Sequence, residues 1–174
     1  MIQRLASLAL VAVCAVGGYY ATMAATPFAL MRLAESKMAG TSPTNSFTHS
    51  PPVHAERQFV VRPSPDLLYS SCPYDLSAGP LEITAVPVPE RYSSISVFDA
   101  RTDVAFVRND EEMAGQPMRI VLALEGQGVP AGVEVVRLRY PTGIVLQRVL
   151  LADPAEAAQV DPIRSQARCR TLAS

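Results

Sequence analysis

The chain has 174 residues, of which 49% are hydrophobic, and its 15 Lys and Arg against 16 Asp and Glu leave a formal net charge of −1. This length suffices for one domain with attachments. The near-neutral charge, without a basic cluster, argues against nucleic acid as a partner. An apolar fraction near one half argues against an intrinsically disordered chain.

The N-terminal segment is apolar enough to cross a membrane. No charged residue occurs from Leu5 to Met31, and about 20 apolar residues at 1.5 Å each cover a hydrocarbon core of roughly 30 Å. We therefore expect residues 1–26 to form a transmembrane anchor that contacts the lipid bilayer. The span should run from about Ile2 to Thr22, with tyrosines at its end in the headgroup interface.

A cleaved signal peptide is the alternative, with Arg4 as its charged start and a small-x-small cleavage site at 22–24. Continued apolarity to Met31 favours the retained anchor, because a signal peptide normally turns polar after cleavage. One lysine against 14 arginines is typical of a GC-rich bacterial genome. We expect a single-pass protein of the bacterial inner membrane with a periplasmic C-terminal domain, or a protein secreted to the periplasm after cleavage.

Residues 27–56 are expected to connect the anchor to the folded domain. Pro27 to Gly40 has Pro at a first helical position, helix-forming residues throughout and Gly at its end, which predicts a short juxtamembrane helix. Residues 41–56 are rich in Ser, Thr, Pro and His, with little to bury. This composition predicts a linker that lets the domain stand away from the bilayer.

From residue 57 to 152, short β-branched and aromatic runs alternate with Pro and Gly turns, which predicts an all-β antiparallel sandwich or barrel of about eight strands. The strands are expected near 58–62, 67–75, 81–86, 92–99, 104–107, 119–125, 133–140 and 143–151. This density leaves no room for crossover helices and excludes parallel βαβ folds. Residues 153–174 should form a short helix, capped by Asp153, and a tail that runs out from Arg164.

Two of the three cysteines are expected to pair. Cys14 lies in the apolar segment, which leaves Cys72 and Cys169 in the exported body, where an oxidising periplasm favours a disulfide. Two unrelated buried thiols are the alternative. Neither cysteine belongs to a CxxC motif, so the sequence predicts neither a redox enzyme nor a zinc site.

The histidines and serines do not form a recognisable catalytic pattern. His49 and His54 are the only histidines, and their spacing in a Pro-containing segment matches no metal-binding helix face or strand face. We predict no metal and no cofactor. Ser70 and Ser71 lack a GxSxG elbow, and both histidines precede the β domain in sequence, so a serine hydrolase is not favoured.

The aspartates are the better enzymatic candidates, because five of them fall at predicted strand ends or turns. They are Asp66, Asp75, Asp99, Asp103 and Asp110. Paired carboxylates of this kind could share general acid/base work in a periplasmic hydrolase or lyase. Turn aspartates, however, most often accept hydrogen bonds from their own backbone.

About 50 residues from Val60 to Asp110 carry a distinctive series of motifs. The matching positions are Pro65, Asp66, Leu68, Tyr69, Ser70, Asp75, Leu76, Ser77, Gly79, Pro80, Tyr92, Ser96, Phe98, Thr102, Asp103, Asn109 and Asp110. The series resembles the bacterial family called domain of unknown function 1254. Larger relatives carry a second domain after this one, so the resemblance implies a short, membrane-anchored single-domain variant with no known activity. Residues 45–51 resemble the stretch that leads into the motif in short relatives.

The matched motif has a structural and a functional interpretation. Structurally, Gly79-Pro80 would close a hairpin and the aromatic residues would fill a core that lacks tryptophan. Functionally, six polar and aromatic side chains would converge at one end of the sandwich as a pocket for a small-molecule or glycan-like ligand. The six are Asp66, Tyr69, Ser70, Tyr92, Asp99 and Asp103. We expect a ligand-binding or envelope-interaction module.

Overall fold

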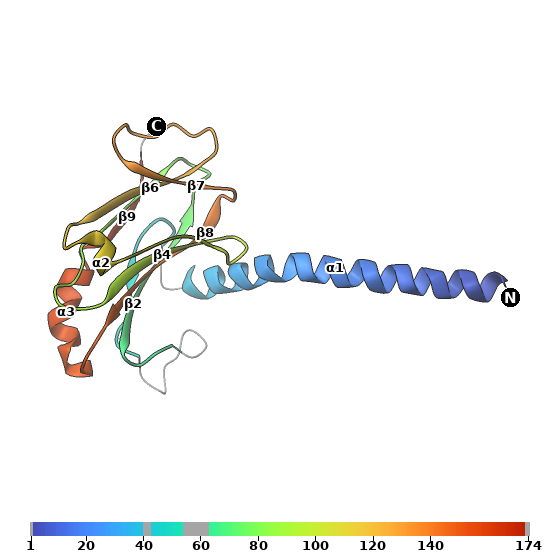
Figure 1. Cartoon of the computed structure of the whole chain (residues 1–174), viewed down its shortest axis with the longest axis horizontal. Coiled ribbons are helices and arrows are strands. Elements are labelled where there is room, and N and C mark those ends of the chain that lie inside the picture. Colours follow the sequence, from blue (N-terminus) through green and yellow to red (C-terminus); the bar gives the residue numbers. More distant parts are fainter. Residues whose placement is uncertain (1, 40–42, 54–62, 173–174) are drawn as a thin grey trace.

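The computed structural model describes residues 2–39, 43–53 and 63–172, in which two β-sheets stack and a long helix projects to one side (Figure 1). The first sheet has the order β1 (Thr48–His49), β2 (Leu67–Asp75), β8 (Thr142–Leu150), β4 (Ser93–Asp99), β5 (Val104–Asn109). The second has the order β7 (Glu134–Leu138), β6 (Met118–Leu124), β3 (Leu81–Ala85), β9 (Arg168–Thr171). Neither sheet closes into a barrel over these described ranges.

The inner faces of the two sheets share one core. Cys72 and Tyr74 of the first sheet belong to the same buried cluster as Ile83 and Ile120 of the second. Burial alternates along the first half of β2, as expected for a strand with one face on the core. β6 is buried on both faces through most of its length, which fits its place between β7 and β3 in the second sheet.

One strand pair departs from the predicted antiparallel arrangement. β7 runs parallel to β6, with Glu134 opposite Ile120. The connection, residues 125–133, contains no helix, and positive φ values at Gly126 and Gly132 allow the chain to reverse at both ends of it. The second sheet is therefore mixed.

The turn after β2 also differs from the prediction. β2 and β3 lie in different sheets, so Gly79-Pro80 does not close a hairpin but carries the chain from one sheet to the other. Gly79 has φ of +144°, and a Cβ at this position would lie 3.3 Å from the Leu172 carbonyl oxygen. Glycine is required here because the turn packs against the end of β9.

The two segments predicted as an anchor and a juxtamembrane helix form one continuous helix, α1 (Ile2–Ala39). Pro27 lies inside it and not at a first position. Its ring leaves the Met23 carbonyl without a helical donor, and the Thr26 hydroxyl donates to the adjacent Thr22 carbonyl at 2.7 Å. The fixed φ of proline is compatible with helical backbone, so a proline in the sequence does not by itself mark the start of a new helix.

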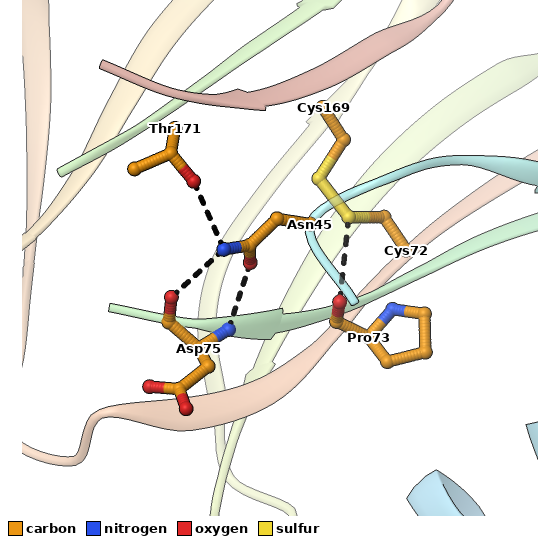
Figure 2. The surroundings of a disulfide bond; sticks show 6 residues. All are labelled: Asn45, Cys72, Pro73, Asp75, Cys169 and Thr171. Carbon is orange, nitrogen blue, oxygen red and sulfur yellow. Dashed lines mark hydrogen bonds between the residues drawn. A yellow bond between two sulfur atoms is a disulfide. The ribbon is translucent and has the colours of Figure 1, made fainter. Parts of the chain in front are cut away.

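Residues 43–53, which we call the strap, pack on the domain, in contrast to the linker predicted for this region. β1 pairs with β2, with His49 opposite Ser70. Asn45 receives a hydrogen bond from the Asp75 backbone N–H and donates to the Asp75 carbonyl and the Thr171 hydroxyl (Figure 2). These bonds fix the strap beside β2 and β9. The predicted strand near 58–62 falls outside the described residues.

The C-terminal segment is ordered by pairing and by a disulfide. The predicted cap is confirmed: Asp153 caps a 3₁₀ turn, η1 (Pro154–Glu156), which leads into α3 (Ala157–Arg164). The tail does not extend away from the domain as predicted, because β9 pairs with β3. The Cys72–Cys169 disulfide links β9 to β2, with a Cα–Cα distance of 6.6 Å (Figure 2).

Candidate functional site

The six residues predicted to converge are divided between the two ends of the first sheet. β2 and β4 both pair antiparallel with β8, so they begin at the same end. Asp66 and Tyr92 immediately precede β2 and β4, and Tyr69 and Ser70 lie in the first half of β2. The other two residues, both aspartates, lie at the opposite end, where β4 turns into β5. The set therefore does not form one pocket.

Of the two aspartates in the β4–β5 turn, Asp99 accepts backbone hydrogen bonds and Asp103 lies near an arginine. One Asp99 carboxylate oxygen accepts from the backbone N–H groups of Arg101 and Asp103 at 2.7 and 3.1 Å. Asp103 is exposed and lies 3.9 Å from the Arg101 side chain. Asp75 likewise accepts from the Ser77 N–H. These contacts confirm the turn role weighed against the acid/base pair.

Tyr69, Tyr92 and Asp66 lie near the start of the sheet and make separate contacts. The Tyr69 hydroxyl accepts a hydrogen bond from the Ser64 N–H at 2.9 Å. Tyr92 is 43% exposed, and the Asp66 carbonyl receives the Leu151 N–H. Of the six residues, Ser70 is the one whose hydroxyl lies beside a cluster of polar side chains.

Ser70 contacts a histidine from the strap. Nδ1 of His49 lies 2.8 Å from the Ser70 hydroxyl oxygen, although 21 residues separate the two in sequence. The pairing of β1 with β2 places them side by side. Ser70 is only 1% exposed, so a substrate could not reach its hydroxyl as a nucleophile. The contact positions the imidazole.

The other partner of Ser70 is Arg164, a buried arginine from α3. Its guanidinium donates to the Tyr69 carbonyl at 2.8 Å, the Ser50 carbonyl at 2.7 Å and the Asp161 carboxylate at 2.6 Å. It also lies 3.5 Å from the Ser70 hydroxyl. Because a buried guanidinium needs several acceptors, Arg164 fastens the strap, β2 and α3 together.

A cavity of about 370 Å³, which we call the strap cavity, opens beside this cluster. Its lining residues are His49, Pro51, Pro52, Leu68, Ala157, Ala158, Asp161 and Arg164. Its volume falls within the range of small-molecule sites. Proline rings, Leu68 and alanines form an apolar wall, and a carboxylate and an imidazole provide the polar groups.

The electrostatics of the strap cavity favour a neutral imidazole. Burial lowers the pKa of His49, and the Arg164 charge lowers it further, whereas Asp161 opposes these effects. Arg164 is already occupied by protein acceptors. The polar groups left for a ligand are therefore a neutral imidazole and a carboxylate that is 53% exposed, which suits a neutral partner with hydroxyl groups.

Sequence reasoning identified Ser70 but missed His49, Asp161 and Arg164 as its neighbours. The sequence predicts a linker around His49 and a tail that begins at Arg164. One signal was available: Val160, Ile163 and Arg164 share the spacing of a single helix face, and Val160 and Arg164 are both buried. An arginine on an apolar face indicates a buried polar contact, but not its partners.

Comparison with solved structures shows the fold alone. The VPA0106 protein from Vibrio parahaemolyticus aligns with a TM-score of 0.62 at 20% identity, covering 82% of this chain and 35% of that one. An uncharacterised protein from Burkholderia cenocepacia aligns with a TM-score of 0.50 at 17% identity, and the alignment covers 82% of this chain and 39% of that one. The chain thus spans little more than a third of the length of these structures.

The family comparison covers the strap, both sheets and the disulfide. Comparison with curated proteins gives no match. The family described as protein of unknown function, DUF1254, matches residues 44–171, a range that begins within the strap and ends at the last residue of β9. The predicted resemblance is confirmed, and this chain belongs to the DUF1254 family.

Proposed function

We propose that this protein is a membrane-anchored module of the bacterial envelope whose β domain binds a small neutral ligand, such as a glycan fragment, in the strap cavity. The anchor and the location rest on the combination of an apolar, exposed N-terminal half of α1 with a folded, disulfide-linked domain, and ligand binding rests on the strap cavity. The first feature supports the anchor, and the second supports an exported domain.

The anchor is supported by the length and exposure of α1. Residues Gln3–Met38 form a helix long and apolar enough to span a membrane, a test that an N-terminal signal sequence also passes. Leu8, Val11 and Val13 are each at least 65% exposed. Apolar side chains in such a row need a lipid or protein environment. The inner membrane is the proposed environment.

The disulfide supports a periplasmic location for the domain. Disulfides persist in oxidising compartments and are rare in the cytosol. The Cys72–Cys169 bond lies between the two sheets, where Cys72 is fully buried. The C-terminal domain is therefore proposed to face the periplasm, with the anchor retained.

The ligand proposal rests on the strap cavity. Its neutral imidazole, its carboxylate and its proline faces suit hydroxyl groups and the apolar face of a sugar ring. The alternative enzyme, which would use paired aspartates, gains no support from the turn aspartates, because Asp99 and Asp75 accept bonds from nearby backbone N–H groups. Binding is the better-supported role.

The anchor is tested first, in membranes from cells that express the full chain. We expect the protein to stay in the membrane fraction after alkaline carbonate extraction and to keep its N-terminus. Release of a mature form that begins near Ala25 would replace the anchor with a signal peptide.

The ligand site is tested with the full chain in nanodiscs on an array of cell-envelope glycans. Ala158→Trp should fill the strap cavity, because Ala158 lines it, and should abolish glycan capture. Gln159→Trp is the matched control, since Gln159 is exposed on the same helix and does not line the cavity. Equal capture by both variants would contradict the site.

A further inference from the structure

The C-terminal third of α1 is docked on the β domain. Phe28 packs edge to face against Tyr140, with ring centroids 5.3 Å apart. Three residues later, Met31 is only 4% exposed. Residues 3–26 are all exposed. The helix therefore leaves the domain at about Pro27, with no flexible spacer between the domain and the apolar half.

The β4–β5 turn, residues 100–103, reaches along the helix beyond that point. Thr102 lines a cavity of about 320 Å³ together with α1 residues that include Tyr19, Met23, Thr26 and Leu30. In Figure 1 this turn projects toward the helix on the side of the domain opposite α3. The turn thus lies beside the apolar half of α1.

The position of the turn fixes its depth relative to a bilayer. If residues 2–22 span the hydrocarbon core, residues 23–26 rise about 6 Å beyond it. The headgroup layer is about 5–7 Å thick on each side. We infer that the β4–β5 turn lies in the headgroup layer of the leaflet from which α1 emerges, so that the bilayer surface is a second binding partner of the β domain. This inference rests on the proposed anchor.

The side chains around the turn suit that layer. Val104 is 57% exposed just after the turn. Arg101 is exposed and lies 3.9 Å from Asp103, a loose pair that leaves it able to bind a lipid phosphate. Outside the turn, the exposed Arg139, which follows β7, lies over the ring of Tyr140, and Tyr140 contacts Phe28 of α1. Arginines and aromatic rings are the side chains that membrane interfaces favour.

The test measures depth with one fluorophore at three positions of the full chain in phosphatidylcholine and phosphatidylglycerol liposomes. Native Cys14, which is a free and exposed thiol, reports on the anchor. Thr102→Cys, in a Cys14→Ala background, reports on the turn, and Gln159→Cys in the same background is the control on α3. Quenching is compared for lipids that carry a nitroxide on the headgroup or in the middle of the acyl chain.

We expect the Cys14 label to be quenched by the acyl-chain nitroxide, and the Thr102→Cys label to be quenched by the headgroup nitroxide several-fold more strongly than the Gln159→Cys label. Quenched Cys14 with equal, weak quenching at the other two positions would overturn the docked turn and leave the anchor standing. An unquenched Cys14 label would overturn both. Arg101→Cys repeats the measurement if Thr102→Cys does not fold, and an intact disulfide verifies folding.

Discussion

The backbone of β8 at Gly143 is packed so tightly that no side chain fits. An ideal Cβ there would overlap the Phe98 carbonyl oxygen and the Tyr74 hydroxyl. That hydroxyl donates to the same carbonyl at 3.0 Å, and burial raises the pKa of Tyr74, which keeps the donor protonated. Because backbone atoms cannot move aside, Gly143→Ala should lower the free energy of unfolding by roughly 3 kcal/mol.

Urea unfolding of the full chain in detergent measures this loss. Gly128→Ala is the matched control, since a Cβ at Gly128 meets nothing within 4 Å, and this substitution should leave the unfolding midpoint nearly unchanged. Equal midpoints for both variants would show that β8 can shift away from β4.

His49 should make the stability of the domain dependent on pH. Its pKa is lowered from the usual value of 6.5 by burial and by Arg164, so the unfolded chain binds a proton more readily than the folded chain. The stabilisation is complete above pH 6.5 and is lost as the pH falls through the window below that value. His49→Asn keeps a polar group beside Ser70 and should flatten this dependence.

Urea midpoints of the wild type and His49→Asn, measured across that pH window, test the prediction. The difference between the two curves isolates His49, because His54 is the only other histidine and is present in both proteins. Parallel curves would mean that His49 titrates alike in the folded and unfolded chains.

At the residue scale, the sequence predicts the role of a side chain whose partners are near in sequence. It does not predict the role of a side chain whose partners are distant in sequence. The sequence predicts the cap at Asp153 and a backbone role for turn aspartates such as Asp99, because both depend on neighbours two to four residues away. It does not predict the role of Arg164, because the acceptors at Ser50 and Tyr69 lie 114 and 95 residues away. No local pattern identifies such partners.

At the scale of elements, apolar alternation located the strands with enough residues to show it. β2 matches its predicted range, 67–75, and β6 and β8 are displaced by one residue. β1 and β9 were missed, because a two-residue strand has no periodicity and the Arg168–Thr171 segment is mostly polar. Tertiary pairing, the strap bonds and the disulfide form these two strands. The apolar alternation of β6 and β7 likewise does not show that the two strands run parallel.

The strap should therefore count as part of the domain in any truncated chain. A chain that begins at Pro43 keeps β1 and the Ser50 carbonyl, whereas one that begins at Arg57 removes an acceptor from buried Arg164. Loss of one acceptor from a charged donor costs roughly 1–3 kcal/mol, and the lost β1 and Asn45 bonds add to this. The shorter chain should have the lower urea midpoint, and equal midpoints would show that the strap is dispensable.

At the scale of the whole molecule, one covalent link joins the two sheets and closes most of the domain into a loop. The Cys72–Cys169 bond has a sequence separation of 97, so in the chain-entropy account it destabilises the unfolded state by about 4–5 kcal/mol. Besides the disulfide, β9 is held by its pairing with β3, by the ion pair between Arg170 and Glu82, and by the Asn45–Thr171 hydrogen bond. These keep the tail in place in the native state without restricting the unfolded chain.

Cys169→Ser should therefore lower the free energy of unfolding by roughly 4 kcal/mol under oxidising conditions while leaving the native fold intact. Unfolding in urea, with and without reductant, measures the effect: the wild type and the variant should differ strongly without reductant and little with it, since reduction opens the same loop. Cys14→Ala is the control, because Cys14 is a free thiol in α1 and closes no loop. Two reactive thiols in the β domain of the oxidised wild type, or equal midpoints without reductant, would rule out the link and leave β9 held by its hydrogen bonds and the Arg170–Glu82 ion pair.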